Sequence, residues 1–278
     1  MRINLEIMKL KLNIALIILS GILLTNCSSG KKENKEQAFE KKAELEEFVE
    51  SNFDYPIPTS FEVTKMLQDA KASYIGDITN DPKNVDKYIT EWQKALNLGV
   101  YGADLSYAST FNKQDRTVAF LEVSRKLVDE LNITTAFNES LVRRLEENLE
   151  NKDSLILIIT ESFFETYNYL NQNGEEKKSL LVVSGSVIEG LYITSELIKS
   201  SNYNQDLMNV LAQQKMQVQK LTELLENHAA DENVNKVLPT LRYINLFFDQ
   251  LGESSEISQG QFEDVATSVA DMRSEIVS

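Results

Sequence analysis

The sequence predicts an all-α protein, a multi-helix bundle or array of about eight to ten helices. Apolar residues recur at helical spacing through most of the chain, and helix caps and breakers recur between these stretches. Short apolar runs such as Leu155–Ile159 and Leu180–Val183 lie inside longer patterns of helical period, so they indicate helices rather than strands. With 278 residues, of which 42% are hydrophobic and 26% charged, the chain can bury a sizeable core.

Each expected helix has its own start signal or apolar stripe. Pro56 and Pro58 end a charged helix that reaches about Glu50, and Thr59 with Glu62 forms a capping box for the next one. We expect helices over Ser60–Tyr74, Lys83–Ser109, Gln114–Leu131, Ala136–Leu149, Ser154–Asn171, Glu175–Ser200, Gln205–Asn227, Asn233–Gln250 and, near the end of the chain, residues 259–276.

The first eight of these helices fall into two sets of four, over residues 59–150 and 153–250. At one constant offset Gly99 matches Gly185, and the clearest further matches are Leu105 with Leu191 and Ser109 with Ser195. Two interpretations stay open: a duplicated four-helix unit, or eight consecutive helices whose regularity imitates a repeat.

Two amphipathic stripes predict packing in the second half. The first is coiled-coil-like, with one polar interruption, and would pair with a neighbouring helix or with another chain; it consists of Leu207, Leu211, Gln214, Val218, Leu221 and Leu225. The second would dock the last helix on the body or serve as a detachable partner-binding element; it consists of Phe262, Val265, Val269, Met272 and Ile276.

Charge and composition exclude several classes of function. The formal net charge of −15 argues against nucleic acid or an anionic membrane surface as the main partner. Cys27 is the only cysteine and His228 the only histidine, so neither an internal disulfide framework nor a transition-metal site is expected, and no cofactor is predicted. No nucleophile elbow, phosphate loop, dinucleotide fingerprint or calcium loop is present.

The N-terminus carries the sharpest signal. Basic residues precede the apolar run Leu12–Leu24, which is too short to span a bilayer as a helix, so residues 1–26 are predicted to be a signal peptide. Leu24-Thr25-Asn26-Cys27 resembles the lipobox of bacterial lipoproteins, with Asn26 departing from the usual small residue. The resemblance implies lipidation of Cys27, and Ser28 after it implies outer-membrane delivery. A secreted protein with an unprocessed thiol is the alternative.

The mature chain then divides into a tether and a body. Residues 27–37 are polar and of mixed charge, which is typical of a solvated tether, and residues 38–278 form the helical domain. Several acyl chains on one cysteine anchor firmly, because each buried methylene contributes about 0.8 kcal/mol. The anchor, not the body, is therefore expected to contact the membrane.

Two glycine-rich stretches, Gly99–Ser109 and Gly185–Ser195, each hold one carboxylate among small and aromatic residues. The candidate ligand-binding residues are Asp104, Glu189, Tyr101, Tyr107 and Tyr192. They could line a pocket for a cationic or hydroxylated ligand, or in principle act as general acid and base. They could instead be buried acids fixed by tyrosine hydroxyls or by one of Arg116, Arg125, Arg143, Arg144 and Arg242. No catalytic residue and no metal ligand is assigned.

As a whole the chain resembles the uncharacterised all-helical lipoproteins of Bacteroidota, most distinctively in the stretch YGADLSYA. That resemblance implies no activity. We expect an outer-membrane-anchored lipoprotein, facing the periplasm or the exterior, whose acidic body binds an envelope protein or a small ligand between the Gly99 and Gly185 helices. The alternatives are an envelope hydrolase that uses Asp104 and Glu189, or a structural component of an envelope complex.

Overall fold

The computed structural model describes residues 60–133, 139–148, 151–250 and 257–278, which belong to one compact unit. These residues contain ten α-helices and no strand, which confirms the all-α prediction. The predicted signal peptide, the tether, the helix up to about Glu50 and the Thr59 cap lie outside the described residues.

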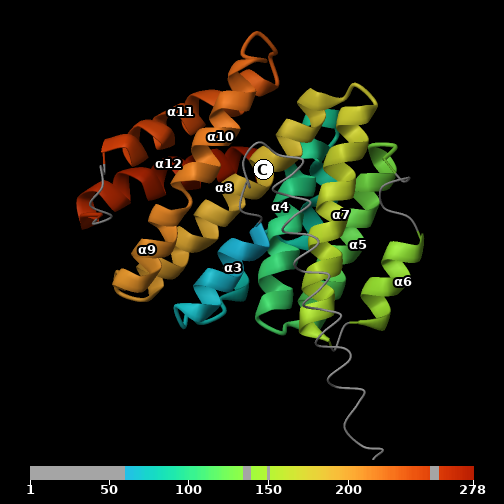
Figure 1. The fold of residues 1–278 in the computed structure, drawn as a ribbon, viewed down its shortest axis with the longest axis horizontal. Helices are drawn as coiled ribbons and strands as arrows, with labels where there is room; N and C mark the ends of the chain where they lie inside the picture. The colour runs from blue at the N-terminus through green and yellow to red at the C-terminus, as the bar shows by residue number, and fades with distance from the viewer. Residues whose placement is uncertain (1–59, 134–138, 149–150, 251–256) are drawn as a thin grey trace, which may run out of the picture. The chain divides into compact units, whose positions relative to one another are not determined.

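Two long helices, α4 and α8, lie side by side at the centre of the described fold (Figure 1). Helices α3, α5 and α7 pack against α4, while α9, α10 and α12 pack against α8, and α11 packs on α10 and α12. The elements are α3 (Ser60–Asp69), η1 (Gly76–Ile78), η2 (Pro82–Lys87), α4 (Glu91–Thr110), α5 (Gln114–Glu130), α6 (Glu139–Glu147), α7 (Lys152–Gln172), α8 (Glu176–Ser200), α9 (Gln205–Gln213), α10 (Lys215–Glu226), α11 (Val234–Gln250) and α12 (Gln259–Val277).

The helix expected over Lys83–Ser109 is two elements. Pro82–Lys87 forms a 3₁₀-helix, Tyr88 is extended, and α4 begins only after Thr90. Thr90 and Gln93 form a capping box, in which each side chain bonds the backbone of the other residue and fixes a new helix start. The first expected helix likewise ends early, at Asp69, because Lys71 adopts a positive φ of 61° that closes the helix.

The helix expected over Gln205–Asn227 is interrupted at Gln214. The buried Gln214 side chain donates from Nε2 to Thr194 Oγ1 at 3.0 Å, and it is here that α9 ends and α10 begins. All six residues of the coiled-coil-like stripe are buried within the described fold, so this seam packs inside the chain. The stripe of the last helix is also buried, and α12 docks on α8, α11 and α4.

The crossing of α4 and α8 brings two backbones into contact. A Cβ atom added at Gly99 would lie 1.9 Å from the Val182 carbonyl oxygen, and one added at Gly185 would lie 1.9 Å from the Leu96 carbonyl oxygen. Leu96 and Val182 are separated by the same offset as Gly99 and Gly185, so the contact is reciprocal, as across a two-fold axis. The duplication itself stays a prediction.

Helix α8 is long and apolar enough to cross a bilayer by length and composition alone. The structure places 89% of its most apolar window inside the fold. A helix that is apolar all round is also what the centre of a globular body requires, so its composition follows from its position between the two groups of helices.

Candidate functional site: a closed carboxyl pair

The structure brings together the two carboxylates that the sequence singles out. Asp104 of α4 and Glu189 of α8 are both fully buried, with exposed fractions of 0%. Each side chain interacts electrostatically with the other across the junction of the two central helices. A buried pair of acids needs counter-charge, hydrogen-bond donors or a proton, because an unpaired buried charge is costly.

Arg273 of α12 supplies the counter-charge. Its Nε donates to Glu189 Oε2 at 3.0 Å and its Nη2 donates to Glu189 Oε1 at 3.2 Å, so the guanidinium bonds both carboxylate oxygens. The guanidinium also lies over the ring of Tyr192, 4.6 Å from the ring centroid, which adds a cation–π contact. Through Arg273, α12 thus makes polar contacts with Glu189 and Tyr192 of α8.

The remaining candidate residues bind the protein's own backbone between α3 and η2. Over this stretch, Ile75–Asp81, here called the inner segment, Asp104 Oδ2 accepts from the Asn80 N–H at 3.0 Å. Tyr107 Oη accepts from the Ile75 N–H at 2.9 Å, and Tyr101 Oη donates to the Asp81 carbonyl at 3.0 Å.

Two arginines also donate hydrogen bonds to the inner segment. Arg273 Nη2 donates to the Ile78 carbonyl at 3.4 Å, and Arg116 Nη2 donates to Thr79 Oγ1 at 2.7 Å. The side chains expected to hold a ligand therefore hold an irregular segment of the same chain. Asp104, Tyr107 and Tyr101 thus bond three backbone groups of this segment, of which the Asn80 N–H is buried.

The surroundings of the carboxyl pair favour the protonated form of Asp104 over that of Glu189. Burial raises the pKa of Asp104 well above its ordinary value, and the negative charge of Glu189 raises it further. Burial also raises the pKa of Glu189, but the charge of Arg273 and its hydrogen bonds counteract that rise. Within the described residues Asp104 Oδ1 has no hydrogen-bond partner, so the charged form of this carboxyl group loses hydration without full compensation.

The two buried tyrosines are donors and acceptors rather than bases. Burial raises the pKa of Tyr101 and of Tyr107 above the ordinary value for a phenol, so both hydroxyls keep their protons at neutral pH. Tyr101 uses its proton to bond the inner segment, and Tyr107 presents its oxygen to it. Their chemistry in this arrangement is structural.

Of the five candidate ligand-binding residues, Tyr101, Asp104, Tyr107 and Glu189 are fully buried and Tyr192 is partly exposed. Cys27 lies outside the described residues. Sequence reasoning missed Arg273, although a signal exists: it lies four residues after Val269 and three before Ile276, so it is a basic residue inside the apolar stripe of the last helix.

None of the arginines proposed from sequence as partners bonds Asp104 or Glu189. Arg144 pairs with Glu161 and Arg242 with Glu226, while Arg125 and Arg143 are exposed. Arg116 reaches the inner segment rather than a carboxylate. Among the described residues, no group of three or more His, Cys, Asp or Glu side chains is placed to hold a metal ion.

Comparison of the chain with protein-family models, with curated protein sequences and with solved structures gave no match. The described residues form an all-helical body in which α12 and the inner segment cover the central carboxyl pair.

The raised pKa of Asp104 predicts an unusual dependence of stability on pH. An acid whose pKa is higher in the folded than in the unfolded chain takes up a proton on folding, so the free energy of unfolding falls as pH rises from about 4, the ordinary pKa, toward the folded pKa. Asp104→Asn, which mimics the protonated acid, should be close to wild type at about pH 4 and more stable than wild type at about pH 8. The difference should grow by up to about 1.4 kcal/mol per pH unit.

Urea denaturation of both proteins between pH 4 and pH 9 measures this difference. Asp231→Asn is the control of opposite sign, since a hydrogen bond from Lys177 lowers the pKa of Asp231; this variant should be less stable than wild type at neutral pH, and the difference should shrink only in acid. Equal pH slopes for wild type and Asp104→Asn would show that Asp104 is ionised in the folded protein.

Proposed function

We propose that the protein is a lipoprotein anchored in the outer membrane through Cys27, and that its acidic body binds a partner protein of the envelope through its outer surface. The lipobox-like sequence Leu24-Thr25-Asn26-Cys27 after an apolar run supports the anchor. The binding role is supported by the closed site, because the side chains best suited to hold a ligand inside the body already hold the inner segment.

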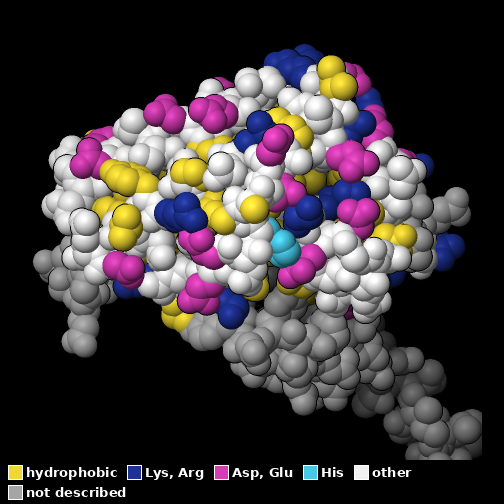
Figure 2. Space-filling view, turned by 90° about the horizontal axis from the view of Figure 1, so that it is seen from above, with side chains coloured by type: hydrophobic (Ala, Val, Ile, Leu, Met, Phe, Trp, Pro, Cys, Tyr) yellow, Lys and Arg dark blue, Asp and Glu magenta, His cyan; other side chains and the backbone are white. Residues whose placement is uncertain are grey.

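The outer surface carries apolar side chains among charged ones (Figure 2), which suits contact with another protein. Figure 2 shows a face on which apolar side chains are interspersed with acidic and basic ones. On α11, Tyr243 and Leu246 are large apolar residues with exposed fractions of 46% and 61%, and their spacing of three places them on one side of the helix. With a net charge of −15, the chain favours a partner with a basic surface.

The geometry does not favour the alternative of an envelope hydrolase. Both oxygens of Glu189 are bonded by Arg273, Asp104 holds the Asn80 amide, and neither carboxyl group is exposed to solvent. General acid–base catalysis needs a substrate within hydrogen-bond reach of the acid and the base. A structural role in an envelope complex would use the same exterior surface as the binding role.

Replacing Cys27 by serine should release the protein from the membrane. Incorporation of labelled palmitate and sedimentation with outer-membrane vesicles should both be lost in Cys27→Ser, because the thiol is the acylated group and the acidic body has little affinity for an anionic surface. Circular dichroism of the released protein should be unchanged, and palmitate incorporation that survives the substitution would refute the anchor.

The partner is sought by photo-crosslinking in intact cells. A photoreactive amino acid at Leu246 should give a discrete crosslinked product that weakens with added salt, while the same residue at Arg125, which is exposed on α5, a helix that packs against α4, is the control position. The same product from both positions, or none from Leu246, would argue against α11 as the binding face.

A further inference from the structure

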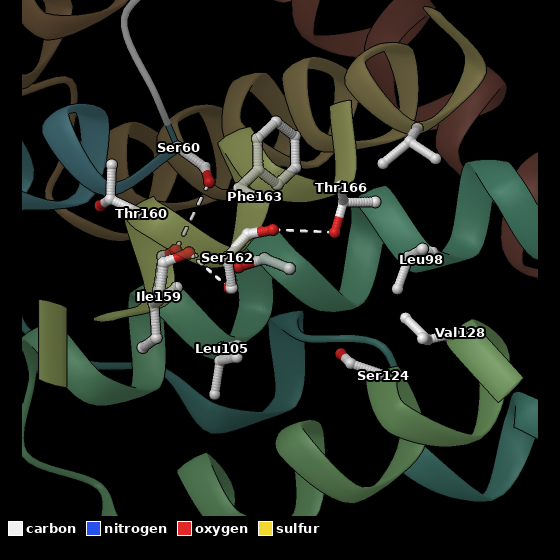
Figure 3. Close-up of a pocket in the computed structure, with 13 residues that line it drawn as sticks. Ser60, Leu98, Leu105, Ser124, Val128, Ile159, Thr160, Ser162, Phe163 and Thr166 are labelled. Carbon is white, nitrogen blue, oxygen red and sulfur yellow. Dashed lines mark hydrogen bonds between the residues drawn. The ribbon is translucent and has the colours of Figure 1, made fainter. Parts of the chain in front are cut away.

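A second internal site lies on the other side of α4 from the carboxyl pair. It is a cavity of about 40 Å³ between α4, α5 and α7, with Val182 of α8 and the first residue of α3 also in its wall (Figure 3). None of the five residues predicted to bind a ligand lines it. Its polar lining consists entirely of hydroxyl groups, those of Ser60, Ser106, Ser124, Thr160, Ser162 and Thr166.

Three of these hydroxyl groups donate their protons to backbone carbonyl oxygens. Ser106 donates to the Gly102 carbonyl at 2.9 Å, Ser162 to the Ile159 carbonyl at 2.7 Å, and Thr166 to the Ser162 carbonyl at 2.8 Å. A hydroxyl that has donated its proton still has oxygen lone pairs to offer. The wall of the cavity is thus rich in hydrogen-bond acceptors.

Ser124 of α5 differs from the others. Its side chain is 3% exposed, its Oγ has no hydrogen-bond partner among the described residues, and it lies at the cavity between Leu105 and Val128 (Figure 3). A buried hydroxyl without a partner loses its hydration with no compensating bond. A molecule in the cavity that bonds Ser124 would remove that cost.

The rest of the lining disfavours a charged ligand and can contact a short hydrocarbon group. The apolar walls include Leu98, Leu105 and Phe163, and none of the thirteen lining residues is ionisable. An ion would lose its hydration here without gaining a counter-charge. The volume corresponds to about three water-sized positions, so it fits a molecule of three or four non-hydrogen atoms.

We propose that this cavity binds a small neutral molecule that carries hydrogen-bond donors, such as a primary amide or a short diol. The donors meet the acceptor-rich wall, a polar atom of the molecule bonds Ser124, and its hydrocarbon part contacts the Leu98 and Leu105 side. The site is independent of the carboxyl pair and of the proposed partner surface, so it can be tested whether or not the envelope partner exists.

Acetamide and acetone are a matched pair of probes, because they differ only in an amide NH₂ in place of a methyl group. Methyl NMR of the purified mature protein should show saturable shifts of Leu105, Val128 and Val182 with acetamide, and at least fivefold weaker binding of acetone. Equal affinities would refute the requirement for donors, and no saturable shift with either probe would mean that the cavity holds only water.

Two variants locate the probe. At Gly102 an added methyl group would have its nearest neighbour, the Phe163 ring, at 3.9 Å, so Gly102→Ala should fold normally, fill much of the cavity and weaken acetamide binding at least tenfold. Gly260→Ala makes the same change at an exposed position of α12, with no atom within 4 Å, and should leave binding unchanged.

Ser124→Ala tests the hydroxyl without removing the cavity. It should weaken acetamide binding about fivefold, leave acetone binding unchanged, and leave the melting temperature of the free protein at or above that of wild type, since the Oγ has no partner to lose. Acetamide affinity equal to wild type in both Gly102→Ala and Ser124→Ala would place the probe elsewhere and overturn the proposal.

Discussion

Substituting alanine for Gly99 or Gly185 should destabilise the protein by about 4 kcal/mol or more, a large part of the roughly 5–15 kcal/mol that stabilises a typical domain. The added Cβ would lie 1.9 Å from a carbonyl oxygen of the facing helix, and neither backbone can give way as a flexible side chain could. The two central helices would have to separate along their whole contact, which opens the core on both sides.

Gly190→Ala, on the same helix α8, is the matched control. There the nearest atom to an added Cβ is Gln214 Oε1 at 3.8 Å, an ordinary contact, so the intrinsic preference of alanine for helix should stabilise by up to about 1 kcal/mol. Chemical denaturation of the three variants measures both effects. Losses of less than about 1 kcal/mol at Gly99 and Gly185 would mean that the helices do not touch as closely as described.

Arg273→Met should cost about 3–5 kcal/mol, because it leaves the Glu189 carboxylate buried without its counter-charge and removes a donor from the Ile78 carbonyl. The loss should shrink as pH falls, since Glu189 can then take up a proton and become neutral. Arg273→Lys should recover only part of the stability, because an ammonium group cannot bond both carboxylate oxygens in the planar geometry of a guanidinium.

A double-mutant cycle separates the charge from the packing of α12. If the buried charge is responsible, adding Glu189→Gln to Arg273→Met should restore a large part of the lost stability, as both members of the ion pair are then neutral. Strictly additive losses in the double variant would show instead that Arg273 acts through its contacts with Tyr192 and the rest of the body.

The helices could be predicted because apolar spacing and caps are local properties of the sequence. Asp81 caps the 3₁₀-helix η2 and Asn204 caps α9, each through a side-chain bond to a backbone N–H two or three residues ahead. Thr90 and Gln93 have the spacing of a capping box, but the apolar pattern continues across this break, so the pattern alone predicts one helix instead of two elements. Gln214 is visible in the sequence as a polar interruption of the stripe, but its bond to Thr194, which belongs to another helix, is not a local property of the sequence.

The candidate site could be predicted only in part. A carboxylate among small and aromatic residues was a correct signal of burial for Asp104 and Glu189. Their partners could not be identified in the same way, since Arg273 lies far along the chain and Asn80 contributes a backbone amide that any residue except proline would supply. The sequence thus singled out the two acids, and the structure shows that they are buried and bonded to the protein itself rather than open to a ligand.

The ion pair between Arg273 and Glu189 also bears on the order of folding. Arg273 bonds Glu189, which lies 84 residues earlier, and the Ile78 carbonyl, which lies 195 residues earlier, so the centre of the body is completed by contacts of large sequence separation. Closing such long loops slows folding. The ion pair that neutralises Glu189 is therefore expected to form late in folding, after the helices of the centre have met.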